Sequence, residues 1–266
     1  MDQSRRNILK GAILGVGAGM VASALSPATA KAEEVGALIP RGATTLKELA
    51  ERLAKAPRRR NFKSLPMVLT DKNQWDWEAL DEVFNYRGGP KQVWDNYDIH
   101  SAWLNVMRNA MNAQIWSYKN PNFLCVSATH GNAHFAIYDD YVWETYITPL
   151  TKGKLKKNVW LKMKPGMLEK NSPTDESGAF SPADNSIEAL IERGAVFLAC
   201  HNQTWEMAGL LLKKGINPHK LTHDELSAEL TNHIIPQAIV TPGVVATIPE
   251  LQMRGFHYIS TADFPK

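Results

Sequence analysis

The feature that most constrains this chain is an alternation of short apolar runs with segments of helical periodicity, beginning near residue 91. The apolar runs cover residues 123–128, 195–200, 238–240 and 256–260, and a weaker run covers 92–97. Between them apolar side chains recur at helical spacing, as in the segment 99–118. Continuous apolar strands separated by helices are typical of a parallel sheet covered on both faces. The sequence therefore predicts an α/β fold with a mostly parallel sheet, spanning residues 91–266.

Residues 31–90 lack this alternation and are predicted to be a helical elaboration on the same core. Three tryptophans, Trp75, Trp77 and Trp94, fall in or beside this part. They suit either the lining of a cofactor pocket or aromatic packing under a surface helix. Three helix starts are predicted at Thr45, Asn185 and Thr222, because each is followed three residues later by glutamate, the pattern of a capping box.

Residues 151–184 form an irregular insert. Six lysines fall between positions 152 and 164 without an acidic residue among them, and prolines and glycines follow. A loop of this length in a compact domain is usually functional or disordered. The two interpretations are a lid over the edge of the sheet and a solvated insertion.

The N-terminus is predicted to carry a targeting signal. Residues 4–10, SRRNILK, resemble the twin-arginine export motif, and residues 11–30 are uncharged and rich in glycine and alanine. Ala28, Thr29 and Ala30 read as a small-x-small cleavage site. We expect a signal peptide over residues 1–30, a periplasmic protein and no stable membrane span after its removal; an uncleaved anchor is the alternative. Twin-arginine export often carries proteins already loaded with a cofactor.

Composition excludes several classes of protein. Two cysteines cannot build a disulfide framework, and no CxxC or CxxCH spacing occurs. With 30 basic and 27 acidic residues, the chain lacks the strongly basic balance of a nucleic-acid-binding protein. Neither a GxxxxGK[ST] phosphate loop nor an HExxH zinc helix is present.

Ligands of open α/β sheets bind outside the carboxyl ends of the strands, which selects candidate site residues. Three predicted strands end in polar or glycine-rich segments. These deliver Thr129, His130, Gly131, Asn132 and His134; Cys200, His201 and Asn202; and Thr241, Pro242 and Gly243.

Cys200 is the candidate nucleophile. It lies between a strand and a helix, where backbone N–H groups of the helix N-terminus stabilise a thiolate. His201 and His130 are the candidate proton handlers, and a reactive thiolate is expected to be partly exposed in an electropositive site. A structural, buried cysteine is the alternative. Cys125, in mid-strand, reads as a small buried hydrophobe or as a disulfide partner of Cys200.

His134, Asn132 and Asn202 are the candidate ligands for a small cofactor whose identity the sequence leaves unknown. His130 and His134 are four residues apart and, with Cys200 or His201, suit a metal or one axial position on haem. This spacing carries no metal signature, so we assign no metal ligands. If the chain binds neither a metal nor haem, we expect His130 to cap a loop or to form a hydrogen bond with it.

The order of these pieces resembles the DsrE/DsrF-like sulfur-relay superfamily. The resemblance covers roughly residues 92–266 without the insert. It rests on four segments, residues 195–200, 239–244, 250–252 and 255–259, and on the His130-Gly131 pair. It implies a flavodoxin-like fold, frequent oligomerisation and, in sulfur-carrying members, a cysteine after a middle strand that accepts a persulfide. Cys200 matches that position.

The sequence therefore favours an exported DsrE-like protein that handles sulfur or thiols, with a homo-oligomer, a small sulfur compound or a redox protein as possible partners. Two alternatives remain. One is a periplasmic protein that binds haem, a metal or a small ligand. The other is a non-catalytic interaction subunit, with Trp103, Tyr141 or Trp143 at the partner surface.

Overall fold

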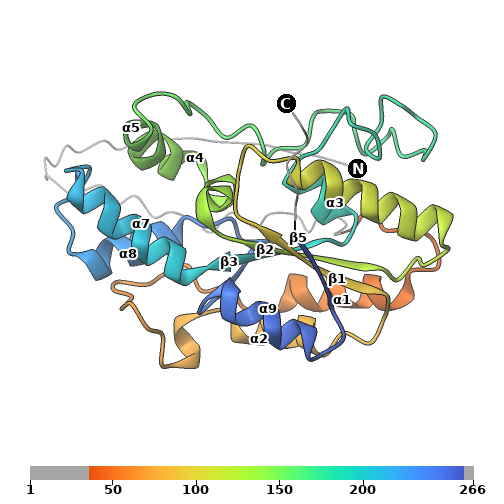
Figure 1. Ribbon diagram of the computed structural model, residues 1–266, viewed down its shortest axis with the longest axis horizontal. Helices are drawn as coiled ribbons and strands as arrows, with labels where there is room; N and C mark the ends of the chain where they lie inside the picture. Colours follow the sequence, from red (N-terminus) through yellow and green to blue (C-terminus); the bar gives the residue numbers. More distant parts are fainter. Residues whose placement is uncertain (1–35, 261–266) are drawn as a thin grey trace, which may run out of the picture. The chain divides into compact units, whose positions relative to one another are not determined.

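The computed structural model describes residues 36–260, which belong to one compact unit. Five parallel strands form its sheet in the order β4-β3-β2-β1-β5 (Figure 1). The strands are β1 (Lys91–Asn96), β2 (Leu124–Thr129), β3 (Val196–Cys200), β4 (Ile239–Thr241) and β5 (His257–Ser260). Every residue of β2 and β3 is buried, as expected of mostly apolar strands covered on both faces. The predicted flavodoxin-like α/β fold is confirmed, whereas the expected signal peptide lies outside the described residues.

Helices cover both faces of the sheet, as predicted (Figure 1). On one face lie α3 (Trp103–Asn112), α6 (Ile187–Glu192), α7 (His201–Lys213) and α8 (His223–Asn232), with the short segments η2 (Ala113–Ser117), η3 (Gly131–Ile137), α4 (Asp140–Val142), η4 (Trp143–Ile147) and α5 (Thr148–Leu150). On the other lie α1 (Thr44–Lys55), α2 (Trp77–Phe84) and α9 (Val244–Gln252), and η1 (Lys72–Gln74) precedes α2. Each face has its own apolar core, so side chains of one strand alternate between two clusters.

One crossover connection, the one between β4 and β5, runs on the opposite face of the sheet from the others. Strands β1 to β4 follow one another across the sheet through helices on the α3 face, and the chain then returns through α9 on the opposite face to place β5 beside β1 (Figure 1). All carboxyl ends therefore meet at one edge, where α7 and α9 both begin directly after strands β3 and β4.

The capping predictions have mixed outcomes. At α8 the capping box is confirmed, because the Thr222 side chain accepts the Glu225 N–H and the Glu225 carboxylate accepts the Thr222 N–H. At α6 the prediction is wrong by one residue. Ser186 is the N-cap rather than Asn185, since its Oγ accepts the Ala189 N–H at 3.1 Å.

The predicted cap at Thr45 is also wrong, because a distant side chain replaces it. Helix α1 begins at Thr44 after Ala43, which makes no side-chain cap. Asn122 Oδ1, just before β2, accepts the N–H groups of Thr45 and Leu46 at 3.0 and 3.3 Å. A tertiary contact thus satisfies the helix start, and it fastens the helical N-terminal part to the sheet.

The insert, residues 151–184, packs on α3. It lacks regular secondary structure, yet Met167, Ala179 and Phe180 are buried with Leu38 in a small apolar cluster. The Phe180 carbonyl oxygen accepts hydrogen bonds from Arg108 Nη1 and Asn112 Nδ2, which both belong to α3. These contacts account for the order of a lysine-rich segment whose charged ends remain in solvent.

Two of the aromatic residues suggested for a partner surface are core residues instead. Trp103 and Trp143 are each 1% exposed, and both belong to the core of the α3 face. Their spacing along helical segments puts them on the apolar side that faces the sheet. No helix among residues 36–260 is long and apolar enough to cross a bilayer.

Candidate functional site

Cys200 ends β3 at the carboxyl edge of the sheet, as predicted, but its thiol is not exposed. The residue is 4% exposed, and its side chain packs in the core on the α9 face. Burial raises the pKa of the thiol, while backbone N–H groups of Gln203, Val244 and Asn202 act in the opposite direction. The expectation of a partly exposed thiol is therefore wrong, because the start of α9 folds across it.

The same contacts define a cradle of amides. Asn202 and Gln203 lie in the first turn of α7, and Val244 is the first residue of α9. Two helix N-termini thus converge on one sulfur, and each carries partial positive charge from its unpaired N–H groups. This arrangement favours a sulfur anion wherever the surrounding shell admits solvent or a ligand.

The histidine next to the thiol faces another part of the chain. His201 Nε2 lies 2.7 Å from the Pro66 carbonyl oxygen and donates to it, and burial lowers the pKa of the ring. Its role as proton handler for Cys200 therefore has no support in the geometry. The imidazole instead fastens the segment before α2 to the start of α7.

His134 holds the backbone of Cys200. Its Nε2 accepts the Cys200 N–H at 3.1 Å, so the ring is neutral with the proton on Nδ1. Burial lowers its pKa to about 3. Asn132 is likewise used internally, since its Oδ1 accepts the Ile99 N–H at 2.6 Å. The assignment of His134, Asn132 and Asn202 to a cofactor stays a prediction.

The buried His134 predicts an acid-sensitive fold. The unfolded ring has a pKa near 6.5 and the folded ring one of about 3, so the unfolded chain binds the proton first as the pH falls. Stability is complete above pH 6.5 and is lost toward pH 3. We expect this group to lower the free energy of unfolding by about 2 kcal/mol between pH 8 and pH 5.

Urea unfolding at several pH values measures this effect. The variant His134→Gln is expected to show a shallower loss of stability below pH 6.5 than the unmodified protein. Parallel curves for the two proteins would show that His134 is not the group responsible.

Cys125 is separated from Cys200 in two ways. Val126 pairs with Val196, so Cys125 is level with residue 195, about 16 Å along the sheet from Cys200 at 3.3 Å per residue. It also belongs to the core of the opposite face. Both cysteines are free, and the proposed disulfide is wrong because its Cα atoms would have to lie within about 7 Å. Burial raises the pKa of the Cys125 thiol, which suits the small buried hydrophobe.

His130 is the first residue after β2, the strand that pairs with β3. The last pair of the β2–β3 register is Thr129 with Ala199, and one further step places His130 level with Cys200, about 5 Å away between Cα atoms. Ala128 and Cys200 both face the α9 side. Since side chains alternate along a strand, His130 leaves the backbone toward that same side.

Two residues that the sequence analysis missed hold His130. Asp95 Oδ1 lies 2.7 Å from His130 Nε2, and the Tyr258 hydroxyl donates to Asp95 Oδ2 at 2.7 Å. Tyr258 belongs to β5, Asp95 to β1, and His130 follows β2, so neighbouring strands supply the three side chains in order. Asp95 and Tyr258 both lie inside their strands, so the strand-end rule, which selects residues at and after the end of a strand, gave no signal for either.

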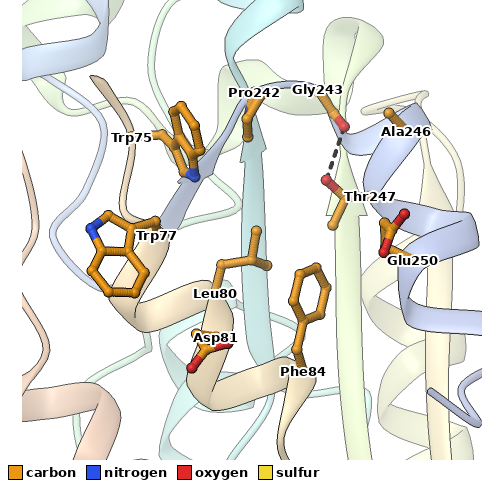
Figure 2. A pocket seen from close by; sticks show the side chains of 10 residues that line it. All are labelled: Trp75, Trp77, Leu80, Asp81, Phe84, Pro242, Gly243, Ala246, Thr247 and Glu250. Atoms are coloured by element: carbon orange, nitrogen blue, oxygen red, sulfur yellow. Dashed lines mark hydrogen bonds between the residues drawn. The ribbon is translucent and has the colours of Figure 1, made fainter. Parts of the chain in front are cut away.

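A cavity of about 330 Å³ opens at the same edge. Figure 2 shows Leu80 and Phe84 of α2 facing Thr247 of α9 across it, with Trp75 and Trp77 beside them. Both tryptophans thus line a cavity, and their role in binding a cofactor stays a prediction. Trp75 also packs against the core of the α3 face, in which Trp94 is buried.

The cavity reaches the start of α9. Gly243 lines it, and the backbone N–H of the next residue, Val244, is one of the groups that lower the pKa of the Cys200 thiol. The Thr247 hydroxyl donates to the Gly243 carbonyl oxygen at 2.9 Å, which fixes this turn of α9 (Figure 2). Cys200 itself is not among the residues that line the cavity.

The described part of the chain holds no cluster of side chains suited to binding a metal ion. Among residues 36–260 no group of three histidine, cysteine, aspartate or glutamate side chains is placed to hold a metal ion. In comparisons with known proteins, no family model, no curated protein and no solved structure matches the chain.

Proposed function

We propose that this is an exported, DsrE-like protein that accepts sulfur on Cys200 from a small organic persulfide. The observation that carries the proposal is the convergence of two helix N-termini on the Cys200 sulfur. Backbone amides at such termini bind anions, and the product of sulfur transfer, a protein persulfide, is an anion when deprotonated. The motif SRRNILK near the N-terminus supports export to the periplasm.

The transfer conserves atoms and electrons without an added oxidant. The Cys200 sulfur attacks the outer sulfur of the donor R–S–SH, a new S–S bond forms, and the S–S bond of the donor breaks. The electron pair leaves on R–S⁻, which takes up the proton lost by Cys200. The products are the Cys200 persulfide and the thiol R–SH. The cavity beside Gly243 provides room for the group R.

Burial sets a condition on this reaction. Because the pKa of the Cys200 thiol is raised, the closed protein holds the thiol protonated at neutral pH. Sulfur transfer therefore requires an opening of the segment around residue 243 or the entry of the donor through the cavity. Either event moves Cys200 from an inert thiol to a thiolate held by amides.

Intact-mass measurement tests the proposal. After incubation with a low-molecular-weight persulfide and desalting, we expect the folded protein to gain the mass of one sulfur atom, which dithiothreitol removes. Cys125→Ser is expected to behave in the same way, and Cys200→Ser to gain nothing. Equal uptake by Cys200→Ser, or no uptake by any of the three proteins, contradicts the proposal.

The cavity also supports the alternative of small-ligand binding without transfer. Its aromatic lining, with Trp75, Trp77 and Phe84, suits an apolar molecule. The same mass measurement separates the two functions, because a ligand held without a covalent bond leaves the denatured protein at its original mass. We also propose that the protein forms a homo-oligomer, as is frequent in the DsrE/DsrF-like superfamily that its sequence resembles.

A further inference from the structure

The row of side chains that leads to Cys200 is the strongest unassigned feature of the site. Tyr258, Asp95 and His130 form two hydrogen bonds of 2.7 Å each across β5, β1 and β2. Cys200 follows on β3, level with His130 by extension of the register. Four neighbouring strands thus present a phenol, a carboxylate, an imidazole and a thiol at one edge of the sheet, on the α9 face.

Exposure distinguishes His130 from the other imidazoles near the thiol. The side chains of His130 and Asp95 are 23% and 20% exposed, so protons can exchange with solvent at this pair. Burial lowers the pKa of both His134 and His201, and both have their Nε2 engaged elsewhere. His130 is therefore the imidazole of the three that is placed to exchange a proton.

The hydrogen bond to Asp95 determines which ring nitrogen of His130 can bind a second partner. His130 Nε2 is held by the carboxylate, which leaves Nδ1 for a second partner. A carboxylate bound to one ring nitrogen orients the ring and stabilises the imidazolium that forms when the other nitrogen takes up a proton. The Tyr258 hydroxyl, bound to the other carboxylate oxygen, holds Asp95 in place.

We propose that His130 accepts the proton of the Cys200 thiol at Nδ1, directly or through one water, and that Asp95 and Tyr258 are its positioning residues. This inference rests on the proposed sulfur transfer and deepens it. The proton moves from sulfur to Nδ1 as the S–S bond to Cys200 forms. It then moves from Nδ1 to the departing R–S⁻, so His130 ends neutral and ready for another cycle.

Other titratable groups surround this pair and must be considered in a pH experiment. Around His130 and Cys200 these are Tyr97, Tyr258, His134, Tyr138, His201 and Glu206. The pKa of Tyr138 is raised by burial, and that of Tyr258 by its hydrogen bond to Asp95. The pKa values of His134 and His201 are lowered. These shifts move all four groups away from the range between pH 7 and pH 9.

The experiment is the pH profile of Cys200 alkylation by iodoacetamide, with Cys125→Ser as the parent protein. His130→Gln and Asp95→Asn are each expected to lower the rate at pH 7 by about tenfold, equivalent to a rise of about one unit in the apparent pKa of the thiol. Tyr258→Phe is expected to lower it by about two- to threefold, since the imidazole and carboxylate remain.

Coupling between the residues separates positioning from a purely structural role. The double variant His130→Gln with Asp95→Asn is expected to be no slower than His130→Gln alone, because the proposed effect of Asp95 on the Cys200 thiol passes through the imidazole. The matched control is Asp139→Asn, since Asp139 also binds a histidine at 2.7 Å, the His233 Nδ1. This control is expected to leave the profile unchanged.

The outcomes distinguish the two proposals. An unshifted profile in both His130→Gln and Asp95→Asn, with Cys200 still reactive, overturns the proton acceptor and leaves sulfur transfer standing. A Cys200 that is inert in every folded variant and in the parent overturns sulfur transfer itself. Circular dichroism checks the fold of each variant; if Asp95→Asn does not fold, the profile of His130→Gln decides the question.

Discussion

Replacing Asp76 by alanine is expected to lower the free energy of unfolding by about 3–5 kcal/mol, because it leaves buried donors without an acceptor. Asp76 is fully buried just before α2. Its carboxylate accepts the Arg59 N–H at 2.7 Å, the Val240 N–H at 2.8 Å and Arg60 Nη1 at 3.0 Å. One side chain thus joins the N-terminal part to β4, across 164 residues of sequence.

Urea denaturation monitored by tryptophan fluorescence measures this loss. The matched control is Glu78→Ala, which removes the partner of Arg59 in a partly buried pair that does not reach β4, and it is expected to cost about 1 kcal/mol. Because Trp75 and Trp77 flank Asp76 and line the cavity, Asp76→Ala is also expected to shift the emission of the folded protein. Equal stabilities of the two variants would contradict the role assigned to Asp76.

Replacing Gly131 by alanine is expected to cost about 2–4 kcal/mol, combining left-handed backbone strain with a steric clash. Gly131 has a φ of +54°, and a Cβ atom there would meet the Tyr97 carbonyl oxygen at 2.4 Å. The carbonyl belongs to the backbone after β1 and cannot swing aside. Because Gly131 follows His130, the strain would also displace the imidazole from Asp95.

A second glycine separates the two causes. Gly215 has a φ of +70°, yet nothing lies within 4 Å of the position of its Cβ, so Gly215→Ala is expected to cost only about 1 kcal/mol. Urea unfolding measures both variants, and the alkylation profile of Cys200 is expected to change only in Gly131→Ala. If the two variants lose the same stability, the close approach to Tyr97 is not what selects glycine at position 131.

The sheet was predictable from the sequence because its central strands are buried on both faces. Strands β2 and β3 are fully buried, so both are mostly apolar, and the polar residues that follow mark the carboxyl edge. The rule that ligands bind at this edge selected Cys200 and His130, and the structure places them at the carboxyl ends of the adjacent strands β3 and β2. Both selections depend on topology alone.

The orientation and burial of the site residues were not predictable in this way. Whether Cys200 is exposed depends on α9, which begins 44 residues later, and the direction of the His201 ring depends on the Pro66 carbonyl. Asn122 replaces the expected cap of α1 for the same reason. Such contacts join distant parts of the chain, and local propensity carries no information about them.

Differential alkylation of the two cysteines tests the central claim most directly. The folded protein is treated with iodoacetamide at pH 7 to 9, quenched, unfolded and labelled again with an isotopic variant, and the label at each cysteine is read by peptide mass spectrometry. We predict that Cys200 takes the first label at a rate that rises with pH, and that Cys125 takes only the second. If Cys200 at pH 9 also takes only the second label, after unfolding, its thiol is inaccessible in the folded protein and the proposed sulfur transfer is wrong.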